Sequence, residues 1–128
     1  MNAQAAAPDR QRKRILCFTS YYLPGFKSGG PLRSLLHMQE WLGDEYEFGI
    51  VTRNRDLGEH VPYKDVETCT WRAVRGVSVW YLPAPQWRPG PILQAVREYQ
   101  PDALYFHSSV DFSLTVVPLM LRRLGFLS

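Results

Sequence analysis

The sequence has few of the features that mark a membrane-spanning or disulfide-bonded protein. None of its apolar runs approaches the ~20 residues that a helix needs to cross a bilayer. The first 14 residues include several alanines but no apolar core of the kind found in secretory signals, so we expect no such signal there. Cysteine occurs only twice, as Cys17 and Cys69, and forms no CxxC motif. We therefore expect neither a transmembrane helix nor a disulfide scaffold.

Metal-binding and hydrolytic motifs are also missing. The three histidines, His37, His60 and His107, are scattered and form no set with metal-ligand spacing, so we predict that no metal is bound. No serine stands in a GxSxG context, which argues against a hydrolase triad. Asp111 precedes an apolar helical pattern, and a role as helix N-cap accounts for it.

Positive charge is concentrated at the start of the chain. The formal net charge is +3, but outside the first 14 residues there are 11 basic and 11 acidic residues. We predict a disordered basic tail over residues 1–13, which accounts for the pI of about 9.0. Such a tail can contact acidic lipids or nucleic acid through phosphate attraction, or it can be a solvated leader. The neutral remainder carries no recognised nucleic-acid motif, so we expect no nucleic-acid partner.

The rest of the chain has the composition of a folded domain, with 45% hydrophobic residues. The apolar run that begins at Arg14 suits a strand buried on both faces, and Pro31 opens a helix with an apolar stripe. Strands alternate with helices, which predicts one α/β domain over 14–128 with a mainly parallel sheet and flanking helices. The expected strands cover 14–22, 46–52, 70–75, 77–82 and 103–106, and the expected helices cover 31–43, 92–99 and 111–123.

The loop between the first strand and the first helix is the most informative segment for function. It has the glycine spacing of half a P-loop, but Pro31 and Leu32 stand where Lys and Ser or Thr should be, and it does not match GxGxxG. Glycine at 29 and 30 lets backbone N–H groups approach a phosphate at the positive end of a helix. Lys27 and Arg33 can add charged contacts. The alternative is a tight turn that needs glycine only for its backbone angles.

His107 is the second candidate, because it follows the last predicted strand. In open α/β sheets ligands bind outside the carboxyl ends of the strands, and the glycine loop leaves the same edge. An imidazole there can donate to a sugar hydroxyl or act as an acid or base near neutral pH. The alternative is a histidine hydrogen-bonded to a neighbouring carbonyl. Aromatic residues near the prolines likewise either stack on a ligand or wedge a loop against the sheet, namely Trp71, Trp80, Tyr81 and Trp87.

An ordered set of segments resembles the start of the family-4 glycosyltransferases of the GT-B fold. The resemblance covers roughly residues 14–125, nearly everything outside the tail. Its segments are Ser20–Ser34, Leu42–Phe48, Val51–Gly58, Pro62 with Tyr63, Trp71, Val79–Pro83 and Pro101–His107. In that family two Rossmann-like domains face each other across a cleft, the first holding mainly the acceptor and the second mainly a nucleotide-sugar. The resemblance therefore implies a Rossmann-like domain and sugar transfer with retention of anomeric configuration, usually without a metal.

The resemblance also implies roles for individual residues. Gly29 and Gly30 match the loop that approaches the donor phosphates, and His107 matches the strand-end histidine that faces the transferred sugar. Arg33 and Lys27 are placed near the phosphates by their positions beside the loop. For acceptor contact we expect the segment from Asp56 to Tyr63.

The last residues, from Leu124 to Ser128, look like a helix exit that leads into another strand. We therefore expect a truncated domain, the incomplete N-terminal half of a GT-B enzyme, with the donor domain and its glutamate pair absent. The resemblance implies a nucleotide-sugar substrate, no separate cofactor, and a glycan or lipid-linked acceptor in cell-surface polysaccharide or glycolipid synthesis. It places the enzyme in the cytoplasm, with peripheral contact to the inner face of the cell membrane. The chain alone is expected to be inactive, because transfer needs both walls of the cleft.

A different class of protein also fits part of the pattern. A small non-catalytic α/β module could use the same Gly29–Gly30 loop to bind a phosphate ligand, or bind a partner protein, without a second domain. Such a module should have a closed sheet edge after residues 111–124, and the pattern there does not indicate one.

Overall fold

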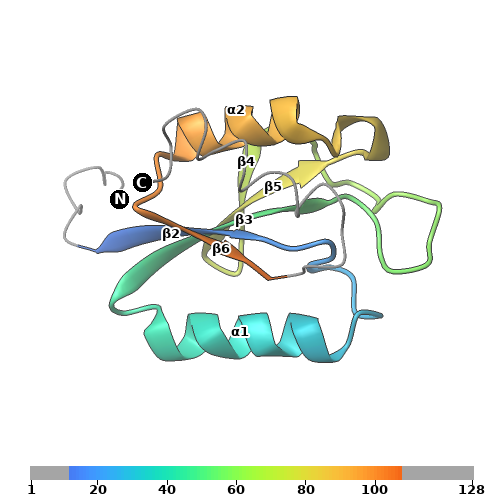
Figure 1. Ribbon diagram of the computed structural model, residues 1–128. Coiled ribbons are helices and arrows are strands. Elements are labelled where there is room, and N and C mark those ends of the chain that lie inside the picture. The colour runs from blue at the N-terminus through green and yellow to red at the C-terminus, as the bar shows by residue number, and fades with distance from the viewer. Residues whose placement is uncertain (1–11, 108–128) are drawn as a thin grey trace.

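The computed structural model describes residues 12–107, and Figure 1 shows the arrangement of their helices and strands. Most of the predicted tail and the predicted helix over 111–123 lie outside the described residues. Arg12 and Lys13, which we assigned to the tail, are described: Lys13 begins the first strand, and the Arg12 guanidinium donates a hydrogen bond to the Gly43 carbonyl at 2.7 Å. Among residues 12–107, no helix combines the length and apolar character needed to span a membrane.

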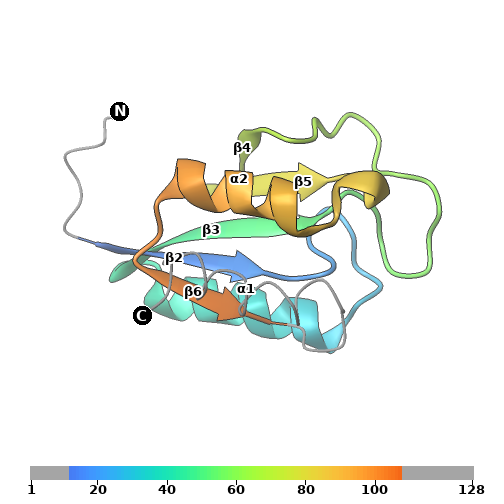
Figure 2. The ribbon, with the colours of Figure 1, turned by 45° about the horizontal axis from the view of Figure 1, so that its top comes forward.

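The fold is mixed α/β, as expected, with a five-stranded and mostly parallel sheet in the order β4-β5-β3-β2-β6. Strands β2, β3, β5 and β6 pair in parallel, and β4 pairs antiparallel with β5. Figure 2 shows β4 and β5 at one side of the sheet and β6 at the other. The strand bounds are Lys13–Phe18 for β2, Tyr46–Arg53 for β3, Trp71–Val74 for β4, Val77–Leu82 for β5 and Ala103–Phe106 for β6.

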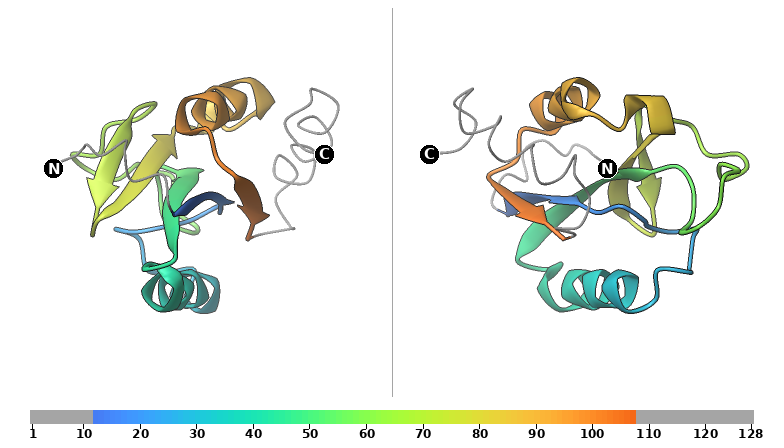
Figure 3. Two further views of the ribbon diagram at one scale, coloured as in Figure 1. Left: turned by 90° about the vertical axis from the view of Figure 1, so that its left-hand side faces the viewer. Right: turned by 45° about the vertical axis from the view of Figure 1, so that its right-hand side comes forward.

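Two helices cover opposite faces of the sheet (Figures 1 and 3). Helix α1 spans Gly30–Leu42 and helix α2 spans Pro89–Tyr99, after the 3-10 turn η1 at Ala84–Gln86. The chain runs from β2 through α1 to β3 on one side, and from β5 through α2 to β6 on the other side of β2. The strand order therefore reverses between β2 and β6.

Each face of the sheet carries its own apolar core, because successive side chains of a strand point to opposite faces. Leu16 and Phe18 of β2 pack on the α2 side, whereas Cys17 packs on the α1 side. This double burial is why the strands read as continuous apolar runs. Burial also raises the pKa of the Cys17 thiol to about 12, as expected for a small buried hydrophobe.

Three of the four tryptophans, namely Trp71, Trp80 and Trp87, belong to the core on the α2 side. Trp71 packs its ring against Trp80 with 5.2 Å between the centroids, and against Tyr99 at 5.1 Å. Trp87 is buried, and the guanidinium carbon of Arg53 lies 4.7 Å from the centroid of its ring. These side chains therefore wedge the segments around the prolines against the sheet, which is the structural alternative of the two interpretations above.

Candidate functional site

The loop after β2 and the residue after β6 meet at the carboxyl edge of the sheet, where the strand order reverses. Ligands of open α/β sheets bind at such a reversal, because the loops on its two sides diverge toward opposite faces. The crossovers that create the reversal are those through α1 and α2 (Figure 1). The topology therefore confirms the prediction that the glycine loop and His107 lie close together.

The start of α1 is open and carries no compensating acid. Gly29 is the N-cap residue with φ 62°, a backbone angle that favours glycine, whereas Gly30 has no such angle. A Cβ built on either glycine meets no described atom within 4 Å. Within the described chain, no side chain caps this helix and its first turn holds no Asp or Glu. The positive end of α1 is thus accessible to an anion.

His107 makes three hydrogen-bonding contacts, one of which reaches the start of α1. Its backbone N–H donates to the Phe18 carbonyl at 2.9 Å, which continues the pairing of β6 with β2. Its ring Nε2 lies 2.6 Å from the carbonyl oxygen of Pro31, and Nδ1 lies 3.3 Å from the hydroxyl of Tyr105. Because a carbonyl only accepts, Nε2 carries the proton. The other ring nitrogen, Nδ1, faces the Tyr105 hydroxyl, which can donate to it.

The structural interpretation of His107 is confirmed, and contact of its ring with a ligand stays a prediction. The ring is bonded to a carbonyl, as the structural alternative holds. That carbonyl belongs to the residue directly after Gly30, so the same bond places the imidazole beside the glycine loop. We did not expect a role for Tyr105 from the sequence. It stands two residues before His107 in the predicted strand, and side chains two positions apart in a strand lie on the same face, which is the signal that could have found it.

The loop that leads to the glycines is fixed by hydroxyl donors from other elements. The Tyr63 hydroxyl donates to the Tyr22 carbonyl at 3.0 Å, and the Tyr81 hydroxyl donates to the Leu23 carbonyl. Burial raises the pKa of Tyr81 to about 12 and that of Tyr63 further, so both hydroxyls remain donors at neutral pH. The peptide bond between Leu23 and Pro24 is cis.

Asp56 ties the same loop from the opposite direction. Its carboxylate accepts hydrogen bonds from the backbone N–H groups of Phe26 at 2.9 Å, Lys27 at 3.2 Å and Leu57 at 2.8 Å. Burial by itself would raise the pKa of Asp56, but these three donors outweigh it and hold the pKa below its usual range. The residue as a whole is only 7% exposed, and its carboxylate faces the backbone of the two loops.

The predicted site residues thus divide into two groups. Gly29, Gly30 and His107 meet at the start of α1, and Arg33 lies exposed in its first turn. Lys27 instead forms an ion pair with Glu59, which raises the pKa of the lysine. Asp56 and Tyr63, which we expected to contact an acceptor, bind loop backbone, so acceptor contact by them stays a prediction.

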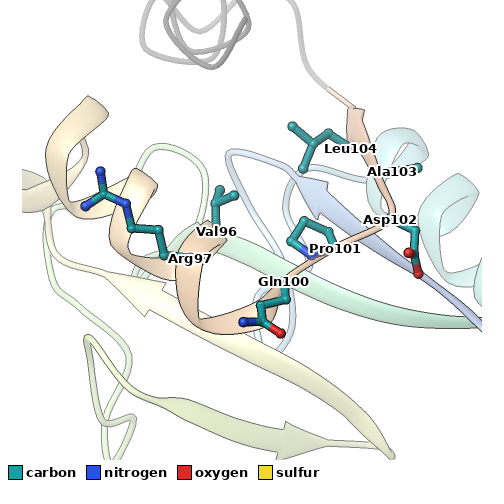
Figure 4. A pocket seen from close by; sticks show the side chains of 7 residues that line it. All are labelled: Val96, Arg97, Gln100, Pro101, Asp102, Ala103 and Leu104. Atoms are coloured by element: carbon teal, nitrogen blue, oxygen red, sulfur yellow. The ribbon is translucent and has the colours of Figure 1, made fainter. Parts of the chain in front are cut away.

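Two cavities of the described fold lie at the amino edge of the sheet, away from this site. One of about 320 Å³ lies between the end of α2 and the start of β6; it is lined by Val96, Arg97 and the segment 100–104 (Figure 4). There the Asp102 carboxylate accepts the Arg14 backbone N–H at 2.8 Å. Another of about 470 Å³ lies beside Gly43 and the turn at Gly76. Within residues 12–107, no cluster of three or more His, Cys, Asp or Glu residues could hold a metal ion.

Comparison with known proteins finds no match to a family model, a curated protein or a solved structure.

Proposed function

We propose that this chain is the N-terminal, acceptor-side part of a retaining family-4 glycosyltransferase with a GT-B fold. The enzyme transfers a sugar from a nucleotide-sugar to a glycan or lipid-linked acceptor, in the synthesis of a cell-surface polysaccharide or glycolipid. The observation that carries the proposal is the meeting of Gly29, Gly30 and His107 at the reversal of strand order, with His107 Nε2 2.6 Å from the Pro31 carbonyl.

The open start of α1 supports binding of the donor diphosphate. Backbone N–H groups and the helix dipole favour an anion there, and the absence of side chains at positions 29 and 30 permits close approach. Arg33 in the first turn adds a cation within the same helix end. No metal is required by this arrangement, because the charge of the diphosphate is met by amides and a guanidinium.

His107 is suited to bind the transferred sugar. Its Nε2 proton is donated to a carbonyl oxygen in the ligand-free arrangement. A sugar hydroxyl oxygen can take the place of that carbonyl without leaving the donor unpaired. The bond of Nδ1 to Tyr105 keeps the ring in the donating tautomer during this exchange.

The test is a titration of the 128-residue chain with UDP, GDP and inorganic pyrophosphate, followed by amide NMR. We expect shifts of the Gly29, Gly30 and Arg33 amides and of His107. Gly30→Leu should abolish them, because the added side chain fills the approach to the helix start without meeting described atoms.

Gly90→Leu is the matched control. Gly90 also lies at a helix start, also precedes a proline and also has open space at its Cβ position. Both variants thus carry the same pre-proline cost. The proposal is wrong if none of the three probes shifts these amides, or if Gly30→Leu binds them as well as Gly90→Leu does.

A further inference from the structure

The loop after β2 and the loop after β3 share one anchoring residue, Asp56. Its carboxylate accepts the backbone N–H of Lys27 at 3.2 Å, and its backbone carbonyl accepts the N–H of Glu59 at 3.0 Å. In Figure 1 both loops lie at the right-hand end of the molecule, where α1 begins. The backbones of Lys27 and Glu59 are therefore held near each other by a residue that is itself buried.

The side chains of Lys27 and Glu59 meet between the two loops. The ammonium of Lys27 donates to a carboxylate oxygen of Glu59, and the two side chains are 45% and 42% exposed. Ion pairs with this exposure contribute little to stability, because water solvates and salt screens both charges. An anion that offers Lys27 an equivalent partner can therefore displace Glu59 at low cost.

Lys27 also stands beside the proposed diphosphate site. It precedes Gly29 by two residues, and the Gly29 N–H donates to the Phe26 carbonyl at 3.3 Å, so the chain turns between Lys27 and the start of α1. The flexible stem of a lysine lets its ammonium serve a partner on either side of such a turn. The carboxylate that competes with a bound anion for Lys27 is that of Glu59, whereas the Asp56 carboxylate is occupied by backbone N–H groups.

We propose that Glu59 sets the affinity of the proposed diphosphate site, because it competes with the bound anion for Lys27. In the ligand-free protein the ammonium is paired with Glu59, and the start of α1 presents only its amides and Arg33. A diphosphate exchanges that ion pair for a charge-assisted hydrogen bond from Lys27, so breaking the pair reduces the net gain of binding. This inference rests on the proposed function, since a diphosphate is the anion concerned.

The test measures the dissociation constant of inorganic pyrophosphate by isothermal titration calorimetry, on the 128-residue chain at neutral pH and low salt. Glu59→Gln keeps the size of the side chain but removes its charge. We expect this variant to bind pyrophosphate about two- to fivefold more tightly than the wild type, the change that corresponds to one exposed ion pair. When Lys27→Met has already removed the ammonium, adding Glu59→Gln should alter the dissociation constant no more than the control variant does.

Asp65→Asn is the matched control, because it removes one negative charge from the same loop as Glu59. Asp65 has a φ of 58°, a left-handed backbone angle that asparagine tolerates well, so the variant should fold. The change in its dissociation constant therefore measures the effect of net charge alone. Circular dichroism checks that each variant is folded.

Two results would overturn the role of Glu59 and leave the diphosphate site in place. One is a gain in affinity no greater than that of Asp65→Asn. The other is an equal gain with and without Lys27, which would show that the Glu59 carboxylate repels the anion directly. If neither the wild type nor any variant binds pyrophosphate, the proposed site is removed and the role of Glu59 with it, so failure of the proposed function is distinguishable from failure of this inference.

Discussion

At the scale of single residues, the buried Asp56 is an acceptor for several backbone N–H groups. Its carboxylate joins two loops that are separated by about thirty positions in the sequence, through N–H donors on Phe26, Lys27 and Leu57. Gly25 lies so close that a Cβ there would come within 2.7 Å of the Asp56 carboxylate and 2.3 Å of the Tyr63 hydroxyl. The position of the loop that precedes Gly29 and Gly30 thus depends on the ionised Asp56 side chain and on the lack of a side chain at Gly25.

We predict that Asp56→Asn lowers the free energy of unfolding by about 1.5–3 kcal/mol, the usual worth of hydrogen bonds to a charged group. Urea denaturation at neutral pH measures the change. The variant keeps the shape of the side chain but replaces one acceptor oxygen by a donor that faces backbone N–H groups. Unchanged stability would mean that the carboxylate does not hold the loops together.

The lowered pKa of Asp56 has a definite consequence for acid stability. A carboxylate whose folded-state pKa is depressed stabilises the protein above its unfolded pKa, about 3.9, and this contribution is lost as the pH falls through the lower folded value. The wild-type chain should therefore lose more stability than Asp56→Asn between pH 6 and pH 3, a range of about three units around that pKa. Parallel curves for the two proteins would contradict this.

At the scale of elements, the contact between β3 and α2 depends on a missing side chain. Gly49 of β3 faces Tyr99 at the end of α2, and a Cβ at position 49 would lie 2.7 Å from the ring carbon Cζ. The ring has little room to move, because it packs against Trp71 and the Arg14 guanidinium carbon lies 4.1 Å from its centroid. The helix can approach the sheet this closely only at a glycine.

We predict that Gly49→Ala destabilises the protein by about 1–3 kcal/mol, the usual cost of overpacking a core. Gly90→Ala is the control, because a Cβ there meets no described atom. It should leave the free energy of unfolding nearly unchanged. Thermal or urea unfolding of both variants makes the comparison, and equal stabilities would show that Tyr99 moves aside freely.

At the scale of the whole molecule, the proposed function makes the described fold one wall of a cleft. Its carboxyl edge brings together an open helix start, a histidine and two loops with exposed apolar side chains. Sugar transfer needs a donor and an acceptor held between two such walls, because correct relative placement supplies much of the rate.

The proposed function therefore predicts that the purified 128-residue chain neither transfers nor hydrolyses a nucleotide-sugar. Release of UDP or GDP from the corresponding sugar nucleotides is the measurement, with and without membrane lipid as acceptor. Turnover that rises with protein concentration and disappears in His107→Ala would show that this chain carries a complete active site, contrary to the prediction.

The sequence by itself determined the local elements and the class of the fold. Apolar runs and helical stripes follow the periods of strand and helix, so the described strands and helices were predicted close to their observed bounds. The first strand is an exception, because it ends at Phe18 although we expected it to continue to Tyr22. Tyr22 is instead buried in the core on the α1 side, although it does not belong to a strand. Its burial therefore comes from tertiary packing and not from strand pairing.

Only the tertiary structure decided which distant groups meet. His107 reaches Pro31 across 76 positions and Asp56 reaches Phe26 across 30, and nothing in the local pattern around either residue specifies its partner. Nor does local pattern tell that Phe26 and Val61 are exposed whereas Trp87 is buried. The physical reason is that periodicity encodes which face of an element is apolar. Strand order and loop contacts instead minimise the free energy of the whole chain, which no single segment contains.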